Sequence, residues 1–375
     1  MVAGEPLTRR APLTEPTAIS LLLGGHWYDA VASLLDVSLA DSNGHHRAVV
    51  PGTPETLVEA RALATAARRV LDLDAEDFST IAGGFSTPWA KRLADSSFPL
   101  EPRDPVRGAL GSLIPLYELM LEVLEIRAMR RESLQIVVTA HLIGEYFAQL
   151  AWQSVLGHAG DPERLGHSVA GSRWGTDDPL CPHSSALRST AKRALNACSG
   201  DTAGYTAYLD RFHSRQGDAL AVCAMNHATI GAGERPDVGD TCPNPCGFVT
   251  SPSMAERRDL DARVRLALLY VDSPIVALRH HAPVGHFFGV PSVQEISDAW
   301  IRTWERVSQP WPDGSNPLLT AGHPDRSAPN EALPGMSALV SAVAGQPIGP
   351  GHLVRDIGSD IARLLGPAHT VEVAT

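Results

Sequence analysis

The chain has 375 residues, 44% of them hydrophobic, which allows two domains or one larger unit with a sizeable core. Its formal net charge of −11 argues against a nucleic acid or an anionic membrane surface as a partner, because both are negatively charged. No apolar run reaches the roughly 18 residues of a membrane-spanning helix and the first residues lack the apolar centre of a secretory signal, so we expect a cytoplasmic protein.

The first 104 residues predict an N-terminal helical region. Residues 19–39 are the first helix candidate. Residues 54–71 predict a second helix, because Thr53 can cap it and its many alanines favour helix. Prolines close this region, so we treat residues 1–104 as one segment.

Residues 105–183 predict two further helices. Apolar residues recur at helical spacing between Leu110 and Leu124. A long apolar helix is then predicted from residue 132 to residue 158, where Gly160 and a proline two positions later end it.

Residues 184–308 repeat this pattern of shorter helices followed by a long one. Helices are predicted over residues 184–198 and 202–230. Apolar residues then recur at spacings of four, three, four and three, which predicts one helix face over residues 261–288. These apolar residues are Val264, Leu268, Val271, Ile275 and Leu278.

Residues 309–375 predict a C-terminal extension. It begins with a stretch rich in proline, glycine and asparagine and ends in a predicted helix over residues 352–365. Long runs that alternate apolar and polar residues are scarce along the whole chain. We therefore expect an all-α fold.

The two long predicted helices are similar enough to suggest an internal repeat. An offset of 129 residues pairs Glu132 with Asp261 and Gly160 with Gly289, whereas the apolar stripes align at an offset of 128. This similarity predicts a helical bundle with two related halves, residues 105–183 and residues 184–308.

The stretch after the second long helix reads GVPSVQEI, from Gly289 to Ile296, and Ser292 with Glu295 fits a capping box. It resembles the Gly-turn-Ser-x-x-Glu-Ile element of the carboxymuconolactone decarboxylase and alkylhydroperoxidase D-like superfamily. The first half resembles the leading helices of that family, followed by a pocket helix that contains Tyr146. The resemblance implies two alkylhydroperoxidase D-like halves and a symmetric homo-oligomer.

The chain departs from the peroxidase members of this family at their redox motif. The stretch that matches their Cys-x-x-Cys reads SPIV, residues 273–276, and contains no thiol. The resemblance therefore implies the decarboxylase type of chemistry, which relies on histidine with acidic or arginine groups. Asp261, Arg279, His280 and His281 are the residues that can fill these roles.

His280 and His281 are the candidate acid/base residues. Their side chains point about 100° apart on a helix, so we expect only one of them to line a pocket. Counting from Asp261 favours His280, and counting back from Gly289 favours His281, which we prefer. Asp261 would orient the histidine, and Arg279 would bind a substrate carboxylate. The alternatives are a structural histidine and an acid that interacts with the helix dipole.

The first half offers further candidates with equally plain structural alternatives. Tyr146 and Trp152 are candidate substrate-binding residues, and Trp152, at the position of the family's pocket histidine, alternatively packs the core. His141 and Glu145 lie one helical turn apart. With Glu118, Glu122 and Glu132 they suggest a di-iron site, although the Glu-x-x-His pairs of such sites are not evident and a buried polar pair is favoured.

The five cysteines are odd in number and thinly spread, as in proteins with reduced thiols. Cys242 and Cys246 lie in a loop dense in glycine and proline, where a staple or two free thiols is favoured over a redox pair or a zinc half-site. Cys223 and His227 have the spacing of a thiolate–imidazole pair, which chance also gives in an alanine-rich helix. We expect thiols not to carry the chemistry.

The sequence thus predicts a lyase or isomerase that needs no cofactor or metal. It would act on a small organic acid or ketone by histidine acid/base chemistry, in a decarboxylation, an isomerisation or a ring opening. One alternative is a non-haem metal oxidase of the di-iron type, which stoichiometric iron or manganese would indicate. The other is a non-catalytic ligand-binding or scaffold protein.

Overall fold

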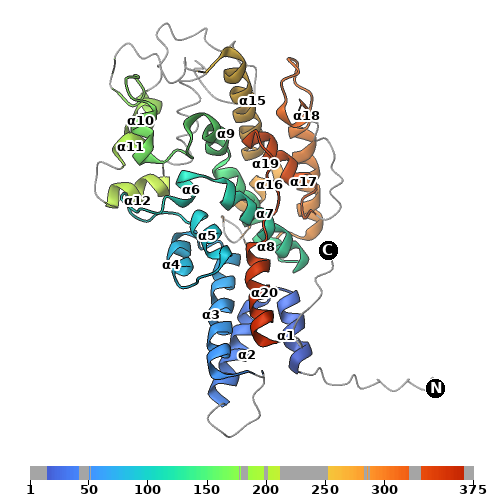
Figure 1. The fold of residues 1–375 in the computed structure, drawn as a ribbon. Coiled ribbons are helices and arrows are strands. Elements are labelled where there is room, and N and C mark those ends of the chain that lie inside the picture. The colour runs from blue at the N-terminus through green and yellow to red at the C-terminus, as the bar shows by residue number, and fades with distance from the viewer. Residues whose placement is uncertain are drawn as a thin grey trace, which may run out of the picture. The chain divides into compact units, whose positions relative to one another are not determined.

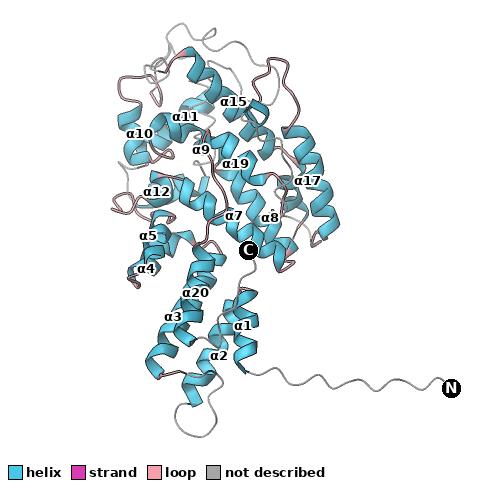
Figure 2. Cartoon of the chain, turned by 45° about the vertical axis from the view of Figure 1, so that its right-hand side comes forward, coloured by secondary structure: helices cyan, strands magenta, loops and turns pink. Residues whose placement is uncertain are grey.

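A computed structural model describes residues 15–41, 50, 52–176, 178, 185–197, 202–211, 252–282, 285, 288–320 and 331–366. Over these ranges the chain forms helices, turns and loops and contains no β-strand (Figure 2). The expected all-α fold is confirmed for this part of the chain. No helix within it is long and apolar enough to cross a membrane.

The chain divides into two compact units, residues 1–73 with 354–375 and residues 74–353. This division differs from the four sequence segments, which were bounded at residues 104, 183 and 308. The physical reason is the last helix, whose apolar face joins the core of the first three helices. Its buried side chains are Leu353, Val354, Ile357, Ile361 and Leu365.

The first unit is a bundle of four helices that lie side by side (Figure 1). They are α1 (Glu15–Gly24), α2 (Tyr28–Asp41), α3 (Pro54–Leu71) and α20 (Leu353–Leu365). Helix α3 has the predicted bounds, and Thr53 caps it by accepting from the backbone N–H of Thr56. The predicted helix 19–39 is instead two helices, because His26 between them takes a φ of 55°. The Tyr28 hydroxyl donates to the Val354 carbonyl at 3.0 Å and ties α2 to α20.

The second unit begins with short helices that lead into one long helix. In chain order they are η1 (Ala75–Asp77), α4 (Phe78–Gly83), α5 (Pro88–Asp95), α6 (Gly108–Gly111) and α7 (Ile114–Met129). Three more helices lie between residues 162 and 211: α10 (Pro162–Ser168), α11 (Ser185–Asn196) and α12 (Thr202–Arg211). The rest of the predicted helix 202–230 lies outside the described residues.

Both of the long predicted helices are broken. The first is α8 (Ser133–Glu145) followed by α9 (Phe147–Leu156), with Tyr146 at the junction. The second is α15 (Met254–Val271), α16 (Pro274–Ala277) and the 3₁₀ helix η2 (Leu278–His281). The prediction of one helix over 261–288 is wrong because Pro274 disfavours helical backbone at the residue before it. Pro274 stands at the first position of α16, where proline is tolerated.

The remaining helices are α17 (Val293–Val307), α18 (Pro317–Thr320) and α19 (Met336–Ala344). Helix α17 begins with the predicted capping box between Ser292 and Glu295. Helix α8 packs on α16, α15 and η2, and α9 packs on α15 and α19. The buried aromatic residues of this unit include Tyr117 of α7, Phe147 and Trp152 of α9 and Tyr270 of α15, and the Phe147 ring contacts those of Tyr117 and Tyr270.

Candidate functional site

The packing of η2 on α8 brings together three polar side chains that are far apart in sequence. Arg279 of η2 donates a hydrogen bond from Nη1 to Nε2 of His141 on α8. The same ring nitrogen lies 2.8 Å from Oε1 of Glu145, one helical turn further along α8. The His141 side chain is 14% exposed and that of Glu145 30% exposed, so both are partly accessible to solvent.

Two buried tyrosines hold the last turns of α8 in place beneath this trio. Tyr270 donates from its hydroxyl to the Ala140 carbonyl at 2.7 Å, and Tyr117 donates to the Ile143 carbonyl at 2.6 Å. Burial raises the pKa of both hydroxyls, so both remain protonated donors. Gly144 allows the Tyr270 ring to approach, since a Cβ there would lie 3.3 Å from the ring.

The carboxylate of Glu145 stands in an unfavourable place for a negative charge. Glu145 is the last residue of α8, where the helix dipole disfavours an anion and favours a cation. Burial, and then the Glu145 charge, raises the pKa of the neighbouring Tyr146 hydroxyl. His141, whose Nε2 lies 2.8 Å from Glu145 Oε1, is one group that can compensate this carboxylate.

The two neighbours of His141 Nε2 require opposite proton states of that atom. Arg279 can donate only to a lone pair on Nε2, which needs a deprotonated nitrogen. Glu145 can accept only from an N–H on Nε2. Within the described part of the chain, Nδ1 of His141 is buried and has no hydrogen-bond partner. The proton on Nε2 therefore decides which of the two neighbours His141 engages.

The predicted acid/base residues directly follow Arg279 of this trio in the chain. His280 and His281 follow Arg279 in η2, and both are exposed. Asp261 lies half-buried in the middle of α15, about 15 Å along the helix axis from Val271, which precedes the break before the histidine segment. It does not open the helix, because α15 begins at Met254. The structure thus does not bring Asp261 to the histidines.

The substrate-binding candidates have different surroundings. Arg279 is part of the trio, and Tyr146 directly follows Glu145 in the chain, with its ring 5.3 Å from that of Phe98. Trp152 is 1% exposed in α9 and packs in the core, as its structural alternative predicted. His227 of the predicted thiolate–imidazole pair lies outside the described residues, as do all five cysteines.

A second histidine cluster resembles a Ser–His pair, but its hydrogen bonds give it a structural role. His158 Nε2 lies 2.9 Å from Ser168 Oγ, and the Asp161 backbone N–H donates to Nδ1 at 3.0 Å. Nδ1 is therefore the acceptor, and the neutral ring carries its proton on Nε2, which donates to the serine. A nucleophilic serine needs a base with the opposite arrangement. His158 thus ties the turn before α10 to the end of that helix.

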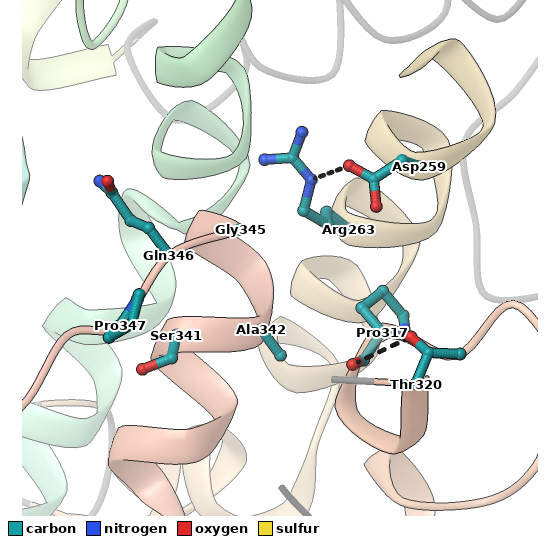
Figure 3. A pocket seen from close by; sticks show the side chains of 9 residues that line it. All are labelled: Asp259, Arg263, Pro317, Thr320, Ser341, Ala342, Gly345, Gln346 and Pro347. Atoms are coloured by element: carbon teal, nitrogen blue, oxygen red, sulfur yellow. Dashed lines mark hydrogen bonds and ion pairs between the residues drawn. The ribbon is translucent and has the colours of Figure 1, made fainter. Parts of the chain in front are cut away.

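The structure also contains a cavity of about 350 Å³ next to the N-terminal part of α15 (Figure 3). Arg263 and Asp259 of α15 line it, together with residues of α18 and α19. Neither His280 nor His281 lines it. No sequence pattern pointed to this cavity, because its walls come from segments that are about 80 residues apart.

The described residues contain no group of three or more His, Cys, Asp or Glu side chains placed to hold a metal ion. Of the acids considered for a di-iron site, Glu132 instead forms ion pairs with Arg127 and Arg130. The Arg279–His141 contact spans 138 residues, so only the His141–Glu145 spacing within α8 could be predicted from sequence. No family model, curated protein or solved structure matches this chain.

Proposed function

We propose that this protein is a cofactor-free enzyme that moves a proton on a small organic acid or ketone, with His141 as the acid/base. The observation that carries the proposal is the shared Nε2 atom of His141, which faces a guanidinium and a carboxylate at once. Decarboxylation, isomerisation and ring opening are the reactions that such a group serves.

The three side chains have distinct parts in this proposal. Arg279 binds the substrate carboxylate, because a guanidinium offers two parallel donors to the two carboxylate oxygens. When Arg279 turns to the substrate, it releases the lone pair of His141 Nε2, which then takes a proton from the substrate. Glu145 accepts from the resulting imidazolium and stabilises it. Substrate binding thereby makes the lone pair of His141 Nε2 available to accept a proton.

The proposal keeps the predicted role of Arg279 and moves the acid/base from His280 or His281 to His141. The reason is burial, since a general base needs a defined orientation and partial exclusion of water. His141 is largely buried and oriented by two partners, whereas His280 and His281 are exposed.

Membership of the carboxymuconolactone decarboxylase-like superfamily remains part of the proposal. Its support is the packing of α8 on α16 and of α9 on α15. In two related halves, α8 corresponds to α15 and α9 corresponds to α16. The α8–α16 contact then corresponds to the α15–α9 contact, as a repeat requires. An offset of 128 residues maps Tyr146 onto Pro274, and each stands where the first helix of its half gives way to the second.

The test measures proton transfer on a panel of β-keto acids, unsaturated lactones and small ketones in D₂O. Solvent deuterium in the product and release of carbon dioxide are followed by NMR. His141→Gln is expected to lower the rate by about 10²–10⁴, the contribution of a positioned acid/base. His280→Gln and His281→Gln are the matched controls and should stay within a few-fold of the wild type. A folded His141→Gln protein with the wild-type rate would refute the proposal.

A ligand-binding role without chemistry is the second candidate. The cavity beside Arg263 favours it, since a binding protein needs a cavity and no acid/base group. Wild-type protein that turns over no member of the panel but binds a small molecule in this cavity would favour this second function.

A further inference from the structure

The cavity in Figure 3 has a buried arginine in its wall. The Arg263 side chain is 8% exposed, and its Nε donates to Asp259 at 2.8 Å. Its Nη1 faces three acceptors, which are the Ala151 carbonyl, Ser154 Oγ and the Ala344 carbonyl, at 3.1 to 3.3 Å. Arg263 therefore joins the ends of α9 and α19 to α15.

The remaining nitrogen of this guanidinium is not used by the protein. Among the residues that the structure describes, Nη2 of Arg263 has no hydrogen-bond acceptor. A guanidinium carries five N–H donors, and the two on Nη2 are not sealed from solvent, so they can donate to water or to a bound ligand. Nη2 belongs to a residue that lines the cavity, so an oxygen atom of a bound molecule can satisfy it.

Asp259 supplies the complementary group at the same wall. Its side chain is 62% exposed, and within the described residues Arg263 is its partner. A carboxylate has about four acceptor positions, so most of those on Asp259 remain open to a ligand. The pair is electrically neutral, which disfavours a simple anion beside Asp259 and favours a ligand with both a donor cation and an acceptor oxygen.

The size of the cavity and the rest of its lining restrict the ligand further. A volume of about 350 Å³ lies at the small end of the range of about 300–1,000 Å³ for ligand sites. Pro317 of α18 and Ala342 of α19 form apolar parts of the wall across from the ion pair (Figure 3). Ser341 is not free to bind, because its hydroxyl already bonds to the backbone of Ser337 and Ile348.

We infer that this cavity binds a small zwitterion of the α-amino acid type. Its carboxylate accepts from Arg263 Nη2, its ammonium group donates to Asp259, and an aliphatic side chain lies against Pro317 and Ala342. The site is built from α15, α18 and α19, whereas the His141 trio is built from α8 and η2. The inference therefore does not rest on the proposed enzymatic function.

The experiment is calorimetric titration of the full chain with each of the twenty L-amino acids. At least one is expected to bind with a dissociation constant below about 1 mM, which corresponds to roughly 4 kcal/mol. For the amino acid that binds, the matching acid without the amine and the matching amine without the carboxylate are titrated next. Both should bind at least about tenfold more weakly, because each lacks one of two charge-assisted hydrogen bonds.

Asp259→Asn tests the protein side of the same contact. The amide oxygen can still accept from Arg263 Nε, so the fold should persist, but affinity for the amino acid should fall about tenfold. Asp95→Asn is the matched control, since Asp95 forms an exposed i,i+4 ion pair with Lys91 away from the cavity. Thermal unfolding checks both variants. The inference is overturned if no amino acid binds, if the amine-free acid binds equally well, or if folded Asp259→Asn keeps the wild-type affinity.

Discussion

At the scale of single residues, His158 and His141 differ in how their ring nitrogens are hydrogen-bonded. His158 is 2% exposed, and its two ring nitrogens have fixed partners, so it has a structural role. His141 shares one nitrogen between a donor and an acceptor, so it can change its proton state without losing every partner. The direction of each hydrogen bond therefore indicates the role of a histidine better than its proximity to a serine or a carboxylate does.

The pH dependence of stability is predicted to come partly from His158. Burial lowers the pKa of His158 to about 4, from 6.5. Between these values the unfolded chain binds a proton that the native state does not, so stability falls as the pH falls. The loss at this residue is about 2 kcal/mol between pH 7 and pH 5.

Replacing His158 by Asn should remove this contribution, because the Asn oxygen can still accept from the Asp161 N–H but does not titrate. Urea unfolding at pH 7 and pH 5 measures it. The variant is expected to lose less stability than the wild type on acidification. An equal loss in both proteins would show that His158 does not contribute.

At the scale of elements, local signals predicted the helices with clear caps. Helix α3 begins after Thr53 and α17 after Ser292, as expected, because a cap depends on residues within one turn. The apolar stripe from Val264 to Leu278 predicted helical structure but not the break before Pro274, and it marked the buried face only in part, since Val264 and Ile275 are buried whereas Val271 is exposed. The spacing of apolar residues therefore indicated helix, but it fixed neither the buried face nor the end of the helix.

The candidate site was only partly predictable for a related reason. The His141–Glu145 pair is a local spacing, and Arg279 was expected to bind a carboxylate. Their contact depends on how η2 packs on α8, which is a property of the folded chain. The preference for His281 assumed one helix up to residue 288, whereas α15 ends at Val271 and His281 is exposed in η2.

Tyr270→Phe tests how α8 is held. The change removes a buried hydrogen bond and leaves the Ala140 carbonyl without that donor, which costs about 1–2 kcal/mol. Denaturant unfolding measures the cost, and Tyr117→Phe serves as the matched variant because its hydroxyl bonds to the next turn of α8. An unchanged midpoint for both would show that these hydroxyls do not stabilise α8.

At the scale of the whole molecule, the first and last helices share one unit, and the site and the cavity both lie in the other. The resemblance to the carboxymuconolactone decarboxylase-like superfamily predicts a symmetric homo-oligomer. Light scattering coupled to size-exclusion chromatography measures the mass directly. A multiple of the 40.0 kDa chain mass is expected, and a monomer at all concentrations would contradict this part of the account.

The central claim is that Arg279 and Glu145 share one ring nitrogen of His141, and ¹⁵N NMR of the histidine side chains tests it without a known substrate. The His141 signal is assigned by its absence from His141→Gln. Donation from Arg279 to Nε2 predicts that neutral His141 carries its proton on Nδ1, and that Arg279→Met moves the proton to Nε2. A proton on Nε2 in the neutral wild-type ring, unchanged by Arg279→Met, would contradict the claim.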